Sequence, residues 1–255
     1  MNKVVFITGA VKNSGLAIAK KFASQGYDIA LSSRSLESAR KTAEYLSETY
    51  GVRTKGYELT LRSVEDIKSV FADVKETFGR LDALVTVAAH LGVGHEVLTV
   101  TEEQYDDVFD VNAKGCFFCA QQAALIMKEQ HQGSIVFIGS VHYKSAIYGR
   151  LTYAGSKGAI ASMVHNMAFE LAEHGIRVNQ VLPGAVRTDR WDGITAEEEA
   201  RRRRNWPMGI ESTGEDVAEA VYFLSSDAAK TITGAELAVD SGILSCLLAY
   251  NGGKH

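Results

Sequence analysis

Short apolar runs rich in β-branched residues alternate with longer amphipathic stretches along the first 90 residues of the chain. The runs with the length and composition of buried strands are KVVFITG, YDIALSS, VRTKGYEL and DALVTVAA. The stretches of helical length between them are 15–26, 36–50 and 64–78. Because parallel strands need a crossover connection, usually a helix, this alternation predicts a parallel sheet covered on both faces.

The second half of the chain continues the alternation with longer helices. We expect helices over 103–130 and through Tyr153, each followed by a strand, GSIVFIGS and IRVNQVLPG. A polar stretch over 185–206 interrupts the pattern before a helix at 215–225 and the short strand AELAVD. Since no repeat, low-complexity tract or linker marks a boundary, we expect one domain over 1–255 with an excursion at 188–212.

Composition narrows the class of protein. A chain of 255 residues with 46% hydrophobic residues can build one large core. A net charge of −4 argues against a nucleic acid or an anionic membrane as partner, and no apolar run has transmembrane length. The N-terminus does not read as a signal peptide, so a cytoplasmic location is the default expectation. Cys116 and Cys119 form a Cys-x-x-Cys inside a predicted helix, but no second pair with ligand spacing accompanies them, so we predict no metal site.

The stretch LTYAGSKGAI places Tyr153 and Lys157 four residues apart. On a helix such residues share a face, so the Lys157 ammonium can favour the phenolate of Tyr153. The pair is therefore a candidate for proton transfer. With 10 tyrosines in the chain, however, the same spacing also arises by chance as a surface pair, and its context must decide between the two interpretations.

A glycine-containing stretch, TGAVKNSG at 8–15, closes the first predicted strand and opens the first helix. Bare backbone there can approach a phosphate, and a helix N-terminus offers N–H groups and a partial positive charge. This position in an α/β pattern predicts a dinucleotide site, with an ordinary glycine turn as the alternative.

These features together resemble the short-chain dehydrogenase/reductases over nearly the whole chain. The motifs that carry the resemblance are Thr-Gly-x-x-x-(Gly)-x-Gly at 8–15, Asn112, Ser140, Tyr153-x-x-x-Lys157, and Pro183-Gly184 followed by Thr188. The resemblance implies a single doubly wound α/β domain, a Rossmann fold with a seven-stranded parallel sheet. It also implies a catalytic set of Asn112, Ser140, Tyr153 and Lys157. Ser140 would bond the substrate oxygen, Tyr153 would be the acid/base, Lys157 would also hold the nicotinamide ribose, and Asn112 would anchor a water, although Asn112 alone reads equally well as a helix cap or a surface amide.

The family pattern further implies which residues surround the cofactor. They are Gly9, Lys12, Asn13, Gly15, Leu16, Ser33, Arg34, Glu58, Leu59, Ala88, Ala89, Tyr153, Lys157, Pro183, Gly184, Val186 and Thr188. Thr188 would bond the nicotinamide carboxamide, unless PGAVRT is only a turn. Three positions depart from the family. Asn13 replaces its middle glycine and tolerates positive φ, TVAA at 86–89 replaces its Asn-Asn-Ala-Gly, and Glu58 stands where it usually has Asp.

The end of the second predicted strand bears on the choice of cofactor. NAD sites usually place a carboxylate there, whereas this chain has Ser33 and Arg34, with Lys12 in the phosphate loop. Two cations suit the 2′-phosphate of NADP(H), which we therefore predict as cofactor. The alternative is a surface arginine without a ligand.

The sequence indicates the substrate less clearly than it indicates the cofactor. In AEEEARRRR the i,i+4 pairs predict a solvated, self-supported helix rather than an anion site. These pairs are Glu197–Arg201, Glu198–Arg202 and Glu199–Arg203. By resemblance the segment lies where the family carries its substrate lid, so Trp191, Trp206 or one arginine is a candidate substrate contact. His142, two residues after Ser140, is another.

We predict an NADP(H)-dependent oxidoreductase that moves hydride between nicotinamide and a secondary alcohol or ketone. SVHY followed by PMG resembles sugar and polyol dehydrogenases of the family. A 3-oxoacyl thioester reductase and a catalytically silent cofactor-binding protein are the alternatives. The family's interface helices correspond to 103–130 and 151–173, which suggests a homotetramer, although their apolar residues could equally face the sheet. Those residues include Ile160, Met163, Val164, Met167 and Leu171.

Overall fold

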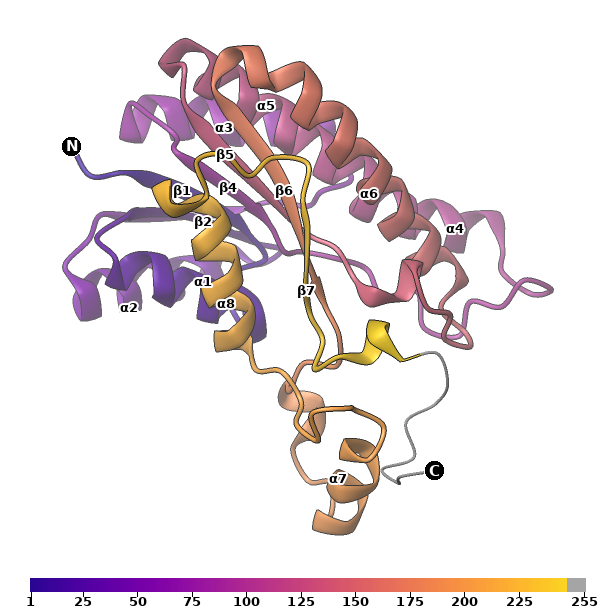
Figure 1. Cartoon of the computed structure of the whole chain (residues 1–255). Coiled ribbons are helices and arrows are strands. Elements are labelled where there is room, and N and C mark those ends of the chain that lie inside the picture. The colour runs from indigo at the N-terminus through magenta and orange to yellow at the C-terminus, as the bar shows by residue number, and fades with distance from the viewer. Residues whose placement is uncertain (247–255) are drawn as a thin grey trace.

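The computed structural model describes residues 1–246, which form a seven-stranded parallel sheet (Figure 1). Its strands are β1 (Val4–Thr8), β2 (Asp28–Ser33), β3 (Thr54–Glu58), β4 (Ala83–Thr86), β5 (Gly133–Ile138), β6 (Ile176–Pro183) and β7 (Glu236–Val239). The strand order is β3-β2-β1-β4-β5-β6-β7, so the winding reverses between β1 and β4. The predicted α/β doubly wound fold is confirmed, and ligands of such sheets bind beyond the carboxyl ends of the strands at this reversal.

Helices cover both faces of the sheet. On one face lie α1 (Asn13–Ser24), α2 (Leu36–Tyr50) and α8 (Gly214–Ser225), and on the other lie α3 (Val64–Phe78), α5 (Cys116–Gln130) and α6 (Leu151–Leu171). Successive strand residues enter opposite cores. Val4 and Phe6 of β1 pack under α3, whereas Val5 and Ile7 pack under α1. This burial on both sides explains why the strands read as continuous apolar runs.

Local signals define where the helices begin and end. The Ser35 hydroxyl accepts from the backbone N–H of Ser38 at the start of α2, at 3.3 Å. Gly51 ends the same helix in the left-handed region, with φ of 68°. Ser63 and Gly79 cap α3 in the same way. Within residues 1–246, no helix is long and apolar enough to cross a membrane.

The predicted single helix over 103–130 is wrong in detail. It divides into α4 (Glu102–Phe109), a π-helical segment (Asp110–Gly115) and α5. The π segment packs closely, because a Cβ on Gly115 would lie only 2.2 Å from the Leu61 carbonyl oxygen. In α5, Cys116 and Cys119 are buried, and burial raises the pKa of both thiols.

The apolar residues proposed for subunit contacts face the core. Ile160 and Val164 of α6 are fully buried against the sheet, and Met163, Met167 and Leu171 pack partly buried beside them. They therefore give no independent argument for an oligomer.

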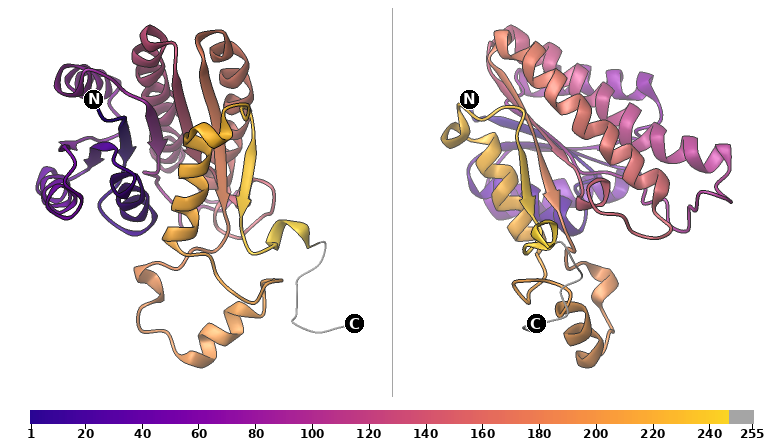
Figure 2. Two further views of the ribbon diagram at one scale, coloured as in Figure 1. Left: turned by 60° about the vertical axis from the view of Figure 1, so that its left-hand side comes forward. Right: turned by 45° about the vertical axis from the view of Figure 1, so that its right-hand side comes forward.

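The predicted polar excursion contains a further helix, α7 (Ala196–Arg203), which begins where the Thr195 hydroxyl accepts from the Glu198 backbone N–H. Figure 2 shows this segment lying beyond the carboxyl ends of β6 and β7.

Candidate active site

The phosphate loop after β1 has no room for side chains at its two glycines. Gly9 has a φ of 67°, and a Cβ there would lie 3.0 Å from Ala88 Cα. A Cβ on Gly15 would lie 2.2 Å from the Gly9 carbonyl oxygen. Asn13, at the position of the family's middle glycine, has a φ of 49°, which asparagine adopts more readily than most residues. The loop therefore forms despite this departure and leads directly into α1, with Leu16 N–H bonded to Lys12 O at 3.2 Å.

The chain after β4 is tied to the same loop by Thr8. The Thr8 hydroxyl oxygen accepts from the backbone N–H of Val87 at 2.9 Å and of Ala88 at 3.2 Å. This explains how TVAA at 86–89 keeps its place without the family's asparagines. Ala89, the last of the four, is exposed, so its methyl group meets no steric barrier from the core.

Asn112 lies on the π segment and is fully buried, so the surface-amide interpretation is wrong. Its Oδ1 accepts from His90 N–H at 2.7 Å, and its Nδ2 donates to His90 O at 2.8 Å and to Ser156 Oγ at 3.0 Å. Asn112 thus joins the chain after β4 to α6. π-Helical turns are frequent at functional sites because they redirect a side chain out of the regular helical ladder.

Lys157 and Tyr153 share one face of α6 at the end of β5. Lys157 is 1% exposed, and its Nζ donates to the Ile138 carbonyl oxygen at 2.6 Å. The same Nζ lies 5.6 Å from the centroid of the half-buried Tyr153 ring. The surface-pair interpretation is therefore wrong, because the ammonium is held inside the protein beside the phenol.

Ser140 follows β5 and is 5% exposed. Its Oγ accepts from His142 N–H at 3.2 Å, which leaves the hydroxyl hydrogen available for a substrate oxygen. The His142 ring lies 6.3 Å from the Tyr153 ring, edge to face. Burial lowers the pKa of His142, and the charge of nearby Arg150 lowers it further. His142 is thus a neutral imidazole at neutral pH, next to the candidate acid/base.

The loop after β6 offers an orphaned polar atom. Thr188 Oγ1 is buried without a hydrogen-bond partner among residues 1–246. Upstream, a Cβ on Gly184 would lie 2.9 Å from Asp240 Cα, which explains the glycine after Pro183. Val186 forms a bridge with Ser212 that closes the base of the excursion. An unpaired buried hydroxyl is costly, so this position fits a ligand with a polar group.

The residues at the end of β2 are more exposed to solvent than those after β5 and β6. Ser33 Oγ accepts from Ser35 N–H at 3.3 Å, and Arg34 is exposed with no ion pair within the described chain. On the neighbouring strand β3, Glu58 lies opposite Ser33 in the register and is exposed, whereas Leu59 is buried. Lys12 forms an exposed ion pair of 3.4 Å with Asp189. Of the two cations predicted to bind the 2′-phosphate, Lys12 is thus paired within the described chain and Arg34 is not.

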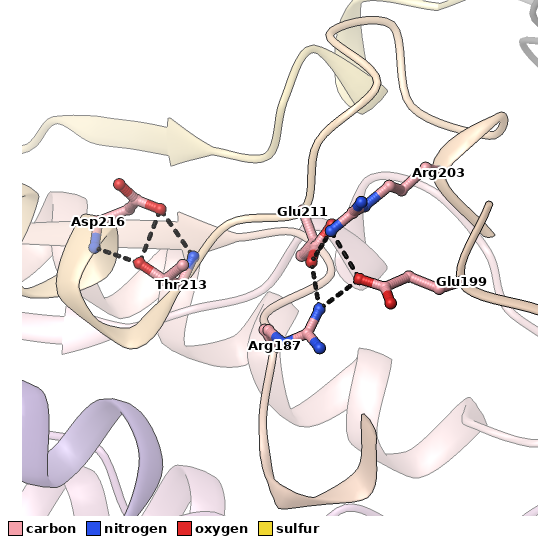
Figure 3. A network of polar contacts seen from close by, with 6 residues as sticks. All are labelled: Arg187, Glu199, Arg203, Glu211, Thr213 and Asp216. Atoms are coloured by element: carbon pink, nitrogen blue, oxygen red, sulfur yellow. Dashed lines mark hydrogen bonds and ion pairs between the residues drawn. The ribbon is translucent and has the colours of Figure 1, made fainter. Parts of the chain in front are cut away.

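The excursion at 188–212 is built around a buried carboxylate (Figure 3). Glu211, 8% exposed, accepts from Arg203 Nε at 2.7 Å and from Arg187 Nη1 at 2.7 Å. Arg187 also reaches Glu199 at 2.6 Å. Hydrogen bonds from Arg203 outweigh burial and, with Arg187, lower the pKa of Glu211 to about 2.

This network corrects one prediction about the arginine run and extends another. Arg201 pairs with Glu198 at 2.9 Å instead of with Glu197, because i,i+3 neighbours are also close on a helix. Arg203 keeps its predicted partner Glu199 but also turns toward Glu211. The predicted pair of Glu198 and Arg202 is present at 3.1 Å, so α7 has the expected internal charge pairs and is in addition anchored to the rest of the chain through Glu211.

Two tryptophans pack within the excursion. Trp191 and Trp206 are both less than 10% exposed, with ring centroids 5.7 Å apart. The guanidinium of Arg202 lies 5.0 Å above the Trp191 ring. Both indoles thus hold the segment together, which leaves little of either surface for a substrate.

A family model described as Enoyl-(Acyl carrier protein) reductase matches residues 9–244. The chain belongs to the short-chain dehydrogenase/reductase family. It is 36% identical to 2-(S)-hydroxypropyl-CoM dehydrogenase 3 of Xanthobacter autotrophicus, over 95% of this chain and 96% of that protein. It is 32% identical to a probable NADP-dependent mannitol dehydrogenase of Yarrowia lipolytica, over 94% and 87%, and to a 3-oxoacyl-[acyl-carrier-protein] reductase of Staphylococcus aureus, over 95% and 98%.

Solved structures of family members share the fold over nearly the whole length. ElxO with NADP bound superposes with a TM-score of 0.90 at 29% identity, covering 96% of this chain and 100% of that one. An NAD⁺-bound xylitol dehydrogenase superposes with a TM-score of 0.86 at 26% identity, covering 94% and 98%. Members of the family thus bind either nicotinamide dinucleotide on this scaffold.

Three residues support the site without having been assigned a role from the sequence, and two of them, Glu211 and Glu236, lie outside the family motifs. Thr8 positions the chain after β4, Glu211 organises the excursion, and Glu236 of β7 bonds Tyr143 next to Ser140. Thr8 was visible as part of the glycine motif, but the two glutamates carry no local signal because their partners lie elsewhere in the sequence.

Proposed function

We propose that this protein is an NADP(H)-dependent oxidoreductase that interconverts a secondary alcohol and a ketone. The observation that carries the proposal is the buried Lys157 ammonium, bonded to Ile138 O at 2.6 Å and one helical turn from Tyr153. A buried ammonium without a carboxylate is costly. It is useful where a neighbouring phenol must give up its proton, because the positive charge stabilises the phenolate.

The side chains divide the work at the reacting carbon. Ser140 donates its hydroxyl hydrogen to the substrate oxygen and so holds that oxygen in place. Tyr153 donates its proton to the same oxygen during reduction and takes it back during oxidation. Asn112 keeps α6 and the chain after β4 together through Ser156 and His90, which places Tyr153 against the ligand. The nicotinamide, when bound, supplies or accepts the hydride.

The cofactor residues fit a nicotinamide dinucleotide. The space that a Cβ on Gly9 or Gly15 would fill lets backbone approach a diphosphate at the N-terminus of α1. The orphaned Thr188 hydroxyl suits the carboxamide. Arg34 and Lys12 would bind a 2′-phosphate, and the probable NADP-dependent mannitol dehydrogenase and the NADP-bound ElxO are in line with this preference. The NAD⁺-bound xylitol dehydrogenase is the counterexample that makes the preference a matter for experiment.

A sugar or polyol is our proposed substrate class. His142, neutral and beside Tyr153, can donate and accept hydrogen bonds to a second hydroxyl group of such a substrate. The names of the probable mannitol dehydrogenase and of the xylitol dehydrogenase among the similar proteins indicate polyol substrates. The reductase of acyl-carrier-protein thioesters keeps the thioester alternative open. In this proposal the segment 188–212 forms the lid over the substrate, and the chain is one domain. The cytoplasmic location and the homotetramer stay predictions.

A substrate panel tests the proposal. NADPH and NADH oxidation is measured with ketoses, simple ketones, steroids and acetoacetyl thioesters, and the reverse reaction with polyols at high pH. We expect the fastest turnover with NADPH and a ketose. Fastest reduction of acetoacetyl thioester would establish the alternative activity, and nucleotide binding without turnover of any compound would establish a catalytically silent protein.

A further inference from the structure

Glu236 of β7 collects three side chains beside the candidate active site. Its Oε1 accepts from the Tyr143 hydroxyl and from Gln180 Nε2, the latter at 2.5 Å, and its Oε2 accepts from Lys144 Nζ. Gln180 lies opposite Glu236 in the register of β6 and β7. Tyr143 and Lys144 belong to the chain immediately after β5. One carboxylate thus joins the edge of the sheet to the turn that carries Ser140.

The Glu236 carboxylate is mostly shielded from water, although its contact with Lys144 is exposed. The Glu236 side chain is 19% exposed, and Gln180 is fully buried. Burial alone would raise the pKa of Glu236, but hydrogen bonds from Lys144, Tyr143 and Gln180 together lower it. Glu236 is therefore ionised at neutral pH, and breaking its contacts would leave a buried polar group unpaired.

The turn that Glu236 holds is short and internally bonded. A 3₁₀ helix (Val141–Tyr143) begins where Ser140 Oγ accepts from His142 N–H. Lys144 N–H and Ser145 N–H both donate to Val141 O, at 3.0 and 2.9 Å. Because so few residues separate Ser140 from Lys144, a shift at one end of the turn moves the other.

The same turn also contacts the helix that carries Tyr153 and Lys157. A Cβ on Gly158 would lie 3.7 Å from Tyr143 Cβ, so Tyr143 packs directly against α6 next to Lys157. The Glu236 carboxylate therefore fixes Tyr143 between β7 and α6. From there the turn runs back to His142 and Ser140.

We infer that Glu236 is a positioning residue for Ser140. Its carboxylate holds the turn at 141–144 so that the Ser140 hydroxyl and the His142 ring meet the substrate beside Tyr153. The inference rests on the proposed function, because it needs Ser140 to act on the substrate. Misplacing a catalytic group by about 1 Å can cost about a hundredfold in rate, so an effect on turnover is expected without an effect on cofactor binding.

Three variants measure the contribution of the carboxylate. Turnover is followed as oxidation of the preferred nicotinamide with the carbonyl compound of the panel that is reduced fastest. Glu236→Ala should lower kcat by about ten- to a hundredfold while the cofactor Kd changes less than about twofold. Glu236→Gln should recover most of kcat, because its amide oxygen still accepts from Tyr143 and Gln180. Tyr143→Phe, which loses one of the three contacts, should lie between the parent and Glu236→Ala.

Asp73→Ala is the matched control. Asp73 of α3 accepts from Lys55 Nζ and from the Tyr57 hydroxyl, both at 2.7 Å, and Lys55 and Tyr57 belong to β3 at the opposite edge of the sheet. Asp73→Ala, like Glu236→Ala, removes a carboxylate that accepts from a lysine and a tyrosine, but it does so far from Ser140. We expect Asp73→Ala to change stability without changing kcat, and an equal loss of kcat in both alanine variants would overturn the inference.

A double-mutant cycle of Glu236→Ala and Ser140→Ala separates the inference from the proposed function. If Glu236 acts through Ser140, Glu236→Ala should lower kcat much less in the Ser140→Ala background than in the parent. Full additivity would overturn the inference and leave the proposed function intact. A Ser140→Ala protein with parental kcat would overturn the inference, because Ser140 would then have no catalytic role to position, while the turnover itself would leave the proposed reaction standing. Should Glu236→Ala not fold, Tyr143→Phe completes the same cycle.

Discussion

The two ends of the site are built differently. At the reaction end, Asn112, Ser140 and Lys157 are each at most 5% exposed, and each is bonded to backbone. At the phosphate end, Lys12 and Arg34 are exposed, and the Lys12 ammonium pairs with Asp189 at 3.4 Å, between two exposed side chains. One end is held by packing and by hydrogen bonds to backbone, and the other presents charge to solvent.

This difference matches what the proposed function requires of each end. Proton transfer depends on positions within a few tenths of an ångström, so the groups that perform it need a packed surrounding. A phosphate carries charge that long, flexible cations can reach from many positions. Substitutions at the reaction end should therefore abolish turnover, whereas those at the phosphate end should shift cofactor preference by degrees.

Tyr153→Phe should have the largest effect. The variant loses only the phenolic proton, so kcat should fall by about 10²–10⁴-fold, the usual contribution of a general acid. Cofactor affinity should barely change, since the ring and Lys157 remain. Steady-state turnover and fluorescence titration of the nicotinamide measure the two quantities separately.

Tyr45→Phe is the control for that substitution, because Tyr45 is 43% exposed on α2, away from β5. It should keep parental activity. A Tyr153→Phe enzyme with more than about a tenth of the parental kcat would show that the acid/base lies elsewhere.

Local motifs explain how much of this molecule was predictable. The sheet followed from the period of the apolar runs, and Tyr153 and Lys157 were found because helical neighbours are four residues apart in sequence. The π turn at Asn112 was missed because the apolar pattern of 103–130 continues through it.

The glutamates Glu211 and Glu236 were not predicted for a different reason. Tyr143 and Glu236 are 93 residues apart, and Arg187 and Glu211 are 24 apart. Charged residues at such separations pair according to how the chain folds back, and neither their type nor their local spacing reports it. The wrong pairing of Arg201 with Glu197 shows the same limit at short range, because i,i+3 and i,i+4 partners compete.

Glu211→Gln sharpens the comparison within the segment at 188–212. The pKa of Glu211 is lowered from 4.5 to about 2, so its ionised form is favoured in the folded state. The carboxylate therefore contributes stability above pH 4.5, about 3 kcal/mol in full, and this is lost as the pH falls toward 2. Thermal unfolding or hydrogen exchange of the segment at pH 7, 4 and 3 should show a gap between parent and variant that narrows in acid.

Lys12→Met is the control for Glu211→Gln, because it removes one partner of an exposed ion pair. Lys12 and Asp189 form a pair whose side chains are 72% and 53% exposed, and such pairs contribute less than about 1 kcal/mol. Its effect on stability should be small. A Glu211→Gln gap that stays constant with pH would mean that the charge of Glu211 does not hold the segment.

Arg34→Leu should have a smaller effect on activity than Tyr153→Phe, and it tests the phosphate end directly. A charge-assisted contact contributes about 1.5–3 kcal/mol, so KM for NADPH should rise roughly ten- to a hundredfold. KM for NADH should barely change, because NADH has no 2′-phosphate. Ser33→Asp should go further, since its carboxylate repels the phosphate and accepts from the free ribose hydroxyl.

The test compares kcat/KM for NADPH with kcat/KM for NADH in four proteins: the parent, Arg34→Leu, Ser33→Asp and the control Lys41→Leu. Lys41 is an exposed cation on α2 that pairs with Glu37 at 2.6 Å, so its loss should leave both cofactors unaffected. Equal weakening of both cofactors by Arg34→Leu, or a parent that favours NADH, would show that Arg34 does not read the phosphate. The glycine loop could not produce a selective loss, because it faces the diphosphate that the two cofactors share.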